Sequence, residues 1–346
     1  MGDLQDSEMA TELCTVAERS GATTGARAVS VTTRNVDRAR AVGGAVYHPH
    51  AIAAGSGSPR FGMRLRGVSA GPMTTGTLEY LSPVRVVAAP FVDWYQVNLA
   101  LTGAVLTTYG GRELVMTSQS GIVHGPDAPS SLEGWRSPAR VLGLKVARRD
   151  LELALMHLTG RRIERAVEFK GGLDAGRGVG LLWTALVRRA SWWSSGPGRD
   201  DDPIGDSLRA AILAALLHAA PHEFSRDLEP ERRGGVAAAH LALAFMHGRV
   251  GAVTVGEAAA RSHIGVRALE KRFLLEWGST PAAMLTEIRL QYARRELEEG
   301  RASASIAEVA TRWGFGHPGR FASRYAERFG ETPSRTRAFA RRHPAA

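Results

Sequence analysis

The chain has 346 residues, of which 44% are hydrophobic, and this length allows two domains with separate cores. No apolar run approaches the roughly 20 residues that a membrane span requires, and the first residues lack the pattern of a signal peptide. We therefore expect a cytoplasmic protein with no membrane partner. The single cysteine, Cys14, excludes an internal disulfide and a cysteine-based zinc site.

The positive charge is concentrated in the last third of the chain. The formal net charge is +10, and residues 231–346 contain 19 Arg and Lys against 11 Asp and Glu, a net of +8. Arginine outnumbers lysine by 41 to 3, so arginine richness by itself is weak evidence for a nucleic-acid ligand. The uneven distribution nevertheless favours a polyanionic partner such as DNA.

The N-terminal half shows the pattern of short strands separated by turns. Residues 1–28 are small, polar and aperiodic, and we expect a disordered tail there. Strands are predicted at 60–68, 74–81, 84–89, 95–103, 104–111 and 122–126. Val97 and Leu99 alternate with Gln96 and Asn98, which predicts a half-buried strand. Together the segments predict a small antiparallel barrel or sandwich.

After about residue 147 the apolar spacing becomes helical. Residues 148–161, 178–193 and 204–220 each follow a helical period. Residues 223–235 are polar and contain Pro230 and a Gly pair, which indicates an interdomain linker. The sequence thus predicts a domain at 29–222, a linker at 223–235 and an all-α domain at 236–341.

The helical domain contains an internal repeat. Glu257 matches Glu308 at an offset of 51, and after one inserted residue Phe273 matches Tyr325 at an offset of 52. The insertion falls in a turn, where an extra residue is best tolerated.

Each copy has the parts of a helix-turn-helix. A short Ala-rich helix (about 255–262 and 306–313) precedes a turn and an amphipathic helix (about 266–276 and 318–328). A connecting helix of about 17 residues follows Pro281 and is expected to stop at Gly300. This spacer would set the units about 34 Å apart, one turn of DNA. The alternative is a helical bundle whose repeat is only structural.

The segments "VGEAAARSHIGVRALEKRF" and "EVATRWGFGHPGRFASRYAERFGETP" resemble the AraC/XylS family of bacterial transcription regulators. Upstream, "VYHPH" and "GIVHGPDAP" resemble the effector-binding domain of one branch of that family. The resemblance implies an α+β protein, with a cupin-like N-terminal β-barrel and dimerising helices. It also implies seven helices in residues 236–341, two helix-turn-helix units in successive major grooves of double-stranded DNA, a homodimer formed through the N-terminal domain, and RNA polymerase as a partner.

Family members read bases with the exposed face of each recognition helix. Carried over to this sequence, that face comprises Arg267, Ala268, Glu270, Lys271, Pro318, Gly319, Arg320, Ser323 and Arg324. Arg can pair with guanine and Glu270 can accept from cytosine N4. Five flanking arginines are expected to serve phosphates or solvent, namely Arg289, Arg294, Arg328, Arg335 and Arg337.

Pro318-Gly319 departs from the family, whose members often have polar side chains there. Pro is favoured at the first helical position, and it pushes the preceding His317 into an extended, N-cap-like conformation. Gly319 would let the helix N-terminus approach a phosphate closely. We therefore predict fewer base contacts and more backbone anchoring in the second unit than in the first.

The N-terminal barrel is expected to hold a small-molecule effector or to be ligand-independent. Candidate lining residues, for each of which ordinary core packing is the favoured explanation, are Trp94, Tyr95, Val97, Leu99, His124 and Trp135. His48 and His50 lack further residues to complete a cupin metal set, and no catalytic motif is present, so we expect no metal, no cofactor and no enzyme activity. The protein is predicted to be an effector-responsive activator. The alternatives are a ligand-independent repressor and a cupin-type metal-dependent enzyme with a basic helical appendage.

Overall fold

The structure is a computed structural model that describes residues 27–54, 61–133, 139–170, 172–193, 203–228, 235–299 and 304–342. The chain divides into two compact units, each considered by itself. Unit 1 comprises Met1–Asp201 and Leu216–Arg226, and unit 2 comprises Asp202–Ala215 and Asp227–Ala346. The expected tail lies outside the described residues except for its last two residues, which begin the first strand. No helix among the described residues is long and apolar enough to cross a membrane.

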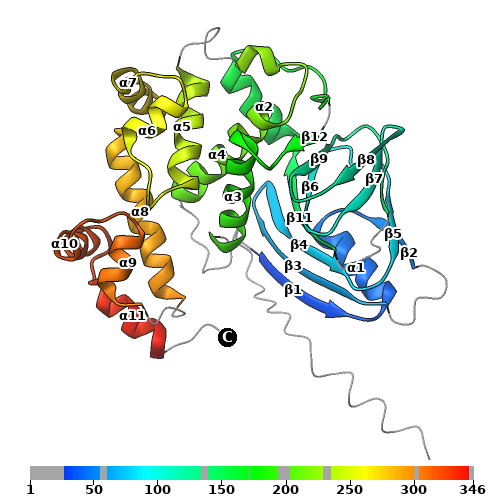
Figure 1. Cartoon of the computed structure of the whole chain (residues 1–346), viewed down its shortest axis with the longest axis horizontal. Coiled ribbons are helices and arrows are strands. Elements are labelled where there is room, and N and C mark those ends of the chain that lie inside the picture. Colours follow the sequence, from blue (N-terminus) through cyan, green and yellow to red (C-terminus); the bar gives the residue numbers. More distant parts are fainter. Residues whose placement is uncertain are drawn as a thin grey trace, which may run out of the picture. The chain divides into compact units, whose positions relative to one another are not determined.

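Unit 1 is built on two antiparallel sheets (Figure 1). The seven-stranded sheet has the order β1-β3-β4-β11-β6-β9-β12, and the five-stranded sheet has the order β2-β5-β10-β7-β8. The strands are β1 (Arg27–Thr33), β2 (His50–Ala54), β3 (Met63–Ala70), β4 (Met73–Tyr80), β5 (Val84–Ala88), β6 (Trp94–Thr102), β7 (Val105–Tyr109), β8 (Arg112–Met116), β9 (Ser120–His124), β10 (Ser130–Glu133), β11 (Ala139–Ala147) and β12 (Gly172–Asp174). The helices are α1 (Val36–Val46), α2 (Arg148–Thr159) and α3 (Gly178–Trp193).

The predicted α+β class is confirmed, and so are all six predicted strands. The cupin-like part is a pair of facing sheets and not a closed barrel. A shared core of buried residues from both sheets, including Met63, Val86 and Val105, holds them together. Burial of this apolar surface is the main stabilising contribution to such a sandwich.

Strand β6 differs from its prediction as a half-buried strand. It lies between β11 and β9, and six consecutive residues from Tyr95 to Ala100 are buried. Its Gln96 and Asn98 side chains are only 6% and 7% exposed. The alternation is genuine, but the polar side chains face the five-stranded sheet, while α2 and α3 contact the sheet's other face (Figure 1). Sequence alternation alone does not distinguish solvent from a polar interior.

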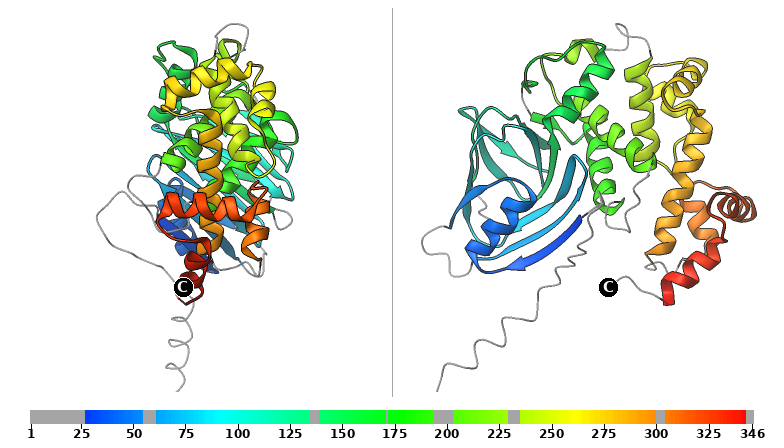
Figure 2. Two further views of the ribbon diagram at one scale, coloured as in Figure 1. Left: turned by 90° about the vertical axis from the view of Figure 1, so that its left-hand side faces the viewer. Right: turned by 180° about the vertical axis from the view of Figure 1, so that it is seen from behind.

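Unit 2 is helical, and residues 235–342 contain seven described helices, as the family resemblance implied. They are α5 (Val236–Gly248), α6 (Val255–Arg261), α7 (Val266–Trp277), α8 (Pro281–Glu298), α9 (Ile306–Arg312), α10 (Pro318–Phe329) and α11 (Pro333–Arg342). Helix α8 runs from the first helix-turn-helix unit, α6 and α7, to the second, α9 and α10 (Figure 2). It ends at Glu298, and Gly300, the predicted stop, lies outside the described residues.

The repeat is visible in the helix caps. Thr254 and Ser305 each accept a hydrogen bond from the backbone N–H of the glutamate three residues later. Glu257 and Glu308 return the contact to the cap backbone, which completes a capping box at the start of α6 and of α9. Because two otherwise orphaned N–H groups are satisfied in each box, both short helices begin at a defined residue.

Helix α4 (Pro203–Ala219) is divided between the units, since residues 202–215 belong to unit 2 and residues 216–219 to unit 1. Within unit 2, Ser207 Oγ lies 2.8 Å from His247 Nε2, and His247 Nδ1 lies 3.3 Å from the Tyr292 hydroxyl. All three side chains are buried, so this chain of polar contacts fastens the start of α4 to α5 and α8. Of the predicted linker, residues 225–228 form a 3-10 helix and 229–234 lie outside the described residues.

Candidate nucleic-acid interface

The two predicted recognition helices are α7 and α10, and each is backed by a buried apolar pair. Leu269 and Phe273 of α7, and Phe321 and Tyr325 of α10, are fully buried. These pairs are spaced i, i+4, which puts both side chains on one face of the helix. The opposite face of each helix is consequently turned outward.

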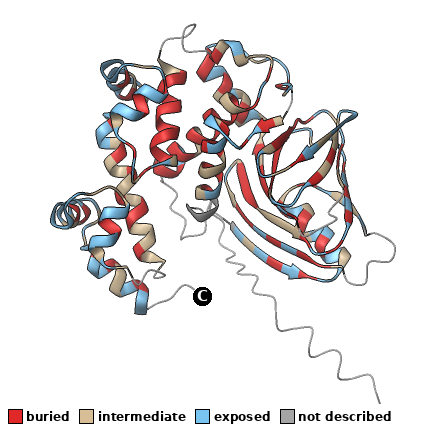
Figure 3. Ribbon diagram, in the orientation of Figure 1, coloured by how far each residue is buried: buried red, intermediate tan, exposed pale blue. Residues whose placement is uncertain are grey.

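All nine residues predicted to contact DNA lie on these outward faces and are exposed, which Figure 3 shows as pale blue turns on α7 and α10. They are Arg267, Ala268, Glu270 and Lys271 on α7, and Pro318, Gly319, Arg320, Ser323 and Arg324 on α10. Within the part of the chain that the structure describes, the four basic side chains among them have no ion pair. Their charges are therefore available to an anionic ligand.

The N-terminus of α10 begins as the sequence predicts. His317 is the N-cap, with extended backbone angles of φ −135° and ψ 119°, and Pro318 occupies the first helical position. A Cβ at Gly319 would have no atom within 4 Å, so the first turn is open to an approaching group. The Ser323 hydroxyl donates to the Gly319 carbonyl oxygen at 3.1 Å, so its proton is already used in a hydrogen bond within the helix.

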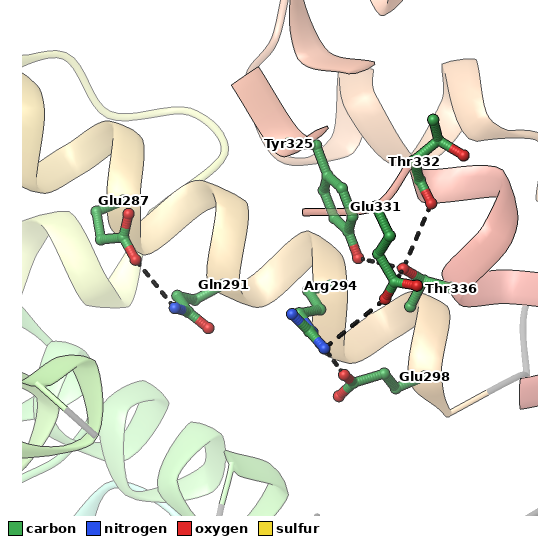
Figure 4. Close-up of polar contacts among 8 residues, drawn as sticks. All are labelled: Glu287, Gln291, Arg294, Glu298, Tyr325, Glu331, Thr332 and Thr336. Atoms are coloured by element: carbon green, nitrogen blue, oxygen red, sulfur yellow. Dashed lines mark hydrogen bonds and ion pairs between the residues drawn. The ribbon is translucent and has the colours of Figure 1, made fainter. Parts of the chain in front are cut away.

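A polar network anchors α10 to α8 and α11 (Figure 4). The Tyr325 hydroxyl donates to Thr336 Oγ1 at 2.9 Å, and Thr336 donates to Glu331 at 2.9 Å. Arg294 of α8 donates to Glu298 at 2.7 Å and lies 3.8 Å from Glu331. Because the tyrosine is buried, its hydroxyl needs this partner, and the network fixes the rotation of α10 about its axis.

The expectation that the flanking arginines serve phosphates or solvent is wrong for Arg289 and Arg294. Arg294 is paired as described above and is 18% exposed. Arg289 donates to the carbonyl oxygens of Val250 and Val253, each at 2.9 Å. Arg328 and Arg337 also have protein partners, whereas Arg335 is exposed.

Arg289 lies where the two helix-turn-helix units meet. The loop before α6 contacts the turn between α9 and α10, and a Cβ at Gly314 would be 2.6 Å from the Gly251 oxygen and 2.8 Å from Arg289 Cζ. Gly314 has φ +80°, and its repeat counterpart His263 also has a positive φ of 54°. Both turns thus need a left-handed residue, but only the second turn is packed so closely that glycine is required.

The residues proposed to line an effector pocket are not brought together. Trp94 lines an open surface groove of about 430 Å³. Tyr95, Val97 and Leu99 alternate with Gln96 and Asn98, are fully buried and do not line the cavity between the sheets. Trp135 lies outside the described residues.

His124 is a buried histidine whose two ring nitrogens each lie near a protein oxygen. Its Nε2 lies 3.1 Å from Thr107 Oγ1, and its Nδ1 lies 3.3 Å from the Gln96 carbonyl oxygen. Burial lowers its pKa to about 4, so the ring is neutral at pH 7.

A cavity of about 70 Å³ does lie between the two sheets, and sequence reasoning missed it. Its polar lining includes Tyr47, His48, His50, Gln96 and Asn98, and its apolar lining includes Leu78, Val86, Leu132 and Val141. The sequence signals of this cavity are the polar alternation in β6 and the "YHPH" segment, but whether these two segments face each other depends on strand order.

Comparison with known proteins adds two family matches. Residues 39–220 match an AraC-binding-like domain, and residues 258–338 match a helix-turn-helix domain. The chain is 33% identical over 306 residues to the "Probable thc operon regulatory protein" of Rhodococcus erythropolis, covering 87% of this chain and 92% of that protein.

Two solved structures are also similar. The DNA-binding domain of AdpA, determined in complex with a target DNA, is 29% identical and matches 32% of this chain and 98% of its own, with a TM-score of 0.29. The AraC-like transcriptional activator CuxR is 15% identical and matches 82% of this chain and 99% of its own, with a TM-score of 0.41.

Proposed function

The chain belongs to the AraC/XylS family and is a helix-turn-helix DNA-binding transcription regulator, and we propose that it reads its operator with α7 and α10 in successive major grooves. The observation that carries this proposal is the duplication of one geometry. Each helix has a buried i, i+4 pair behind it and an exposed, basic face in front. The connecting helix α8 has 18 residues, or roughly 27 Å at 1.5 Å per residue, comparable with the spacing of adjacent turns of DNA.

The two units are proposed to divide the work of recognition. In the first, Arg267 is positioned to pair with guanine O6 and N7, Glu270 to accept from cytosine N4, and Lys271 to contact either bases or phosphates. In the second, Pro318 and Gly319 offer no side-chain donor and Ser323 already donates within its helix. The open first turn of α10 is suited to binding a phosphate through backbone N–H groups, with Arg320 and Arg324 beside it.

A footprint on the intergenic DNA beside the protein's own gene, followed by a base-by-base substitution scan, tests this division. We expect base changes facing α7 to cost about 1–3 kcal/mol each and those facing α10 to cost less. Equal sensitivity of both halves would overturn the division of labour.

Variants of the same protein locate the contacts. Arg267→Ala should relax the preference at one base pair, whereas Arg324→Ala should weaken binding to all sequences and reduce its salt dependence. The exposed Arg112→Ala, on β8 of unit 1, is the control and should leave both properties unchanged. Loss of all sequence preference near 0.15 M salt in the unmodified protein would argue against a specific regulator.

For residues 29–222 we propose effector sensing and homodimerisation, for 223–235 a linker, and for 236–341 DNA binding. We further propose that the protein acts in the bacterial cytoplasm, where it activates transcription through contact with RNA polymerase. A ligand-independent repressor is the alternative. Metal analysis of the purified protein tests the alternative of a cupin-type metal-dependent enzyme, because stoichiometric zinc or iron would support that alternative.

A further inference from the structure

The cavity between the sheets of unit 1 contains several buried polar atoms without a hydrogen-bonding partner. These are the Tyr47 hydroxyl, His48 Nε2, His50 Nε2 and Gln96 Oε1. The side chains of His48 and Gln96 are 7% and 6% exposed. Buried polar groups in folded proteins are nearly always paired with protein groups or ordered water, so four such atoms on residues that line one cavity indicate that the cavity holds polar partners.

The hydrogen-bonding character of two of these atoms follows from their neighbours. His50 Nδ1 lies 2.7 Å from the His48 carbonyl oxygen, which can only accept, so Nδ1 carries the proton. Burial lowers the pKa of His50, the ring is neutral at pH 7, and its Nε2 is therefore an acceptor. Gln96, which lines the cavity, donates its Nε2 to Asn98 Oδ1 at 2.8 Å, and its Oε1 is left as a second buried acceptor without a partner.

Tyr47 and His48 complete the polar side of the cavity. Burial raises the pKa of Tyr47, so its hydroxyl stays protonated and is available as a donor. Burial and the charge of Lys145 lower the pKa of His48 to about 3, so this ring is neutral as well. The nearby Gln96 side chain acts in the opposite direction and raises the pKa of His48. The geometry between the two side chains is nevertheless not that of a hydrogen bond, and His48 Nε2 and Gln96 Oε1 both lack a partner.

Charge further narrows the class of ligand. Among the described residues that line the cavity none is acidic, and the Lys145 ammonium lies close by, 2.5 Å from the Tyr47 carbonyl oxygen and 4.2 Å from the Trp94 ring centroid. A cation would meet this charge with no carboxylate to balance it. An anion would bring its lone pairs against the acceptors His50 Nε2 and Gln96 Oε1.

We propose that this cavity binds a small, neutral molecule that carries N–H or O–H donors at one end and hydrocarbon at the other. The donors face Gln96 and His50, an acceptor receives the Tyr47 hydroxyl, and the hydrocarbon lies against Val86, Leu132 and their apolar neighbours. A volume of about 70 Å³ corresponds to roughly five to seven water-sized positions, the size of a short carboxamide or alcohol. The inference rests on the proposed sensing role of unit 1 and gives its ligand a chemical class.

Four matched probes test the class on the full chain without DNA, by calorimetry or ligand-detected NMR. Butyramide carries N–H donors and an acceptor, and N,N-dimethylacetamide has the same formula but no donor. Butyrate and n-butylammonium supply the negative and positive charges. We expect butyramide to bind with a Kd on the order of a millimolar, as befits so few atoms, and N,N-dimethylacetamide at least about tenfold more weakly. Neither butyrate nor n-butylammonium should displace butyramide from the cavity.

Variants connect the binding to the cavity. Tyr47→Phe removes an unpaired hydroxyl and should weaken the binding of butyramide by about tenfold. Val86→Leu adds a methylene to the wall and should block binding, whereas Val87→Leu, on the exposed face of the same strand, should not. If one variant fails to fold, the other and the probe series still decide the question.

Equal binding of both amides, preference for either ion, binding of no probe, or butyramide binding that survives Val86→Leu would each overturn the proposal. The operator footprint is measured separately, so a protein that binds DNA but not butyramide contradicts only the ligand class. A protein that binds butyramide but has no specific DNA site contradicts the proposed regulatory function instead.

Discussion

Arg289 is predicted to hold the two helix-turn-helix units in one fixed arrangement, and Arg289→Met tests this. Methionine keeps much of the apolar stem but removes the donors to Val250 and Val253, both 2.9 Å from the guanidinium. Hydrogen bonds from a charged donor contribute about 1.5–3 kcal/mol each. Because the freed carbonyl groups can recover some hydration in the variant, we expect unit 2 to lose about 2–4 kcal/mol of unfolding free energy.

Two measurements separate this role from general destabilisation. Urea unfolding, with hydrogen exchange of peptides from unit 2, gives the loss of stability, and the exposed Arg335→Met serves as control and should change it by less than about 0.5 kcal/mol. An operator series with one or two base pairs inserted between the half-sites gives the rigidity. The unmodified protein should discriminate sharply against the insertions, since each base pair displaces the second groove by about 3.4 Å and turns it around the duplex.

In Arg289→Met, the difference in affinity between the original and the altered operators should be smaller than in the unmodified protein, because the second unit can then shift relative to the first. If the variant unfolds like the Arg335→Met control, the assignment of a clamp to Arg289 is refuted. If it is destabilised but keeps the original dependence on half-site spacing, Arg289 stabilises the fold without setting the distance between the recognition helices.

Three further predictions concern stability. Thr254→Ala and Ser305→Ala should each lower the unfolding free energy by about 1 kcal/mol, because each breaks a capping box; an unchanged urea midpoint would contradict this. Gly314→Ala should cost more than about 2 kcal/mol, whereas Gly278→Ala, also at a positive φ but with nothing within 4 Å, should cost about 1 kcal/mol; equal costs would show that the Gly314 packing is unimportant. His124 has a folded pKa of about 4, below its unfolded value of 6.5, so its contribution is complete above pH 6.5 and is lost as the pH falls toward 4. At pH 5 the loss is about 2 kcal/mol, and His124→Gln should lose correspondingly less than the unmodified protein between pH 7 and 5.

The helical half of the fold was predictable because its determinants are local. The capping residues Thr254 and Ser305, the apolar pairs of α7 and α10, and the Pro318 start are all set by residues within one or two helical turns. The internal repeat then doubled each signal. For the same reason the outward face of each recognition helix could be read directly from the sequence.

The parts that were missed depend on distant partners. The acceptors of Arg289 lie 36 and 39 residues away and are backbone carbonyl groups, which leave no trace in side-chain chemistry. In β6 the alternation was seen, but whether Gln96 and Asn98 face water or a second sheet depends on strand order across the sandwich. The short strand β12 and the late strand β11 pair only with strands far away in sequence and had no separate turn signal.

The division of α4 between the units bears on how this protein can be dissected and recombined. A fragment that begins after the predicted linker would lack Ser207, so the buried His247 Nε2 would lose the group 2.8 Å away, and the apolar side chains of Ile204, Leu208 and Ile212 would be removed from the same core. A fragment begun at residue 203 keeps both. For exchange of DNA-binding modules between regulators of this family, the physically sound junction thus lies at the start of α4, before Pro203, and not in the predicted linker at 223–235.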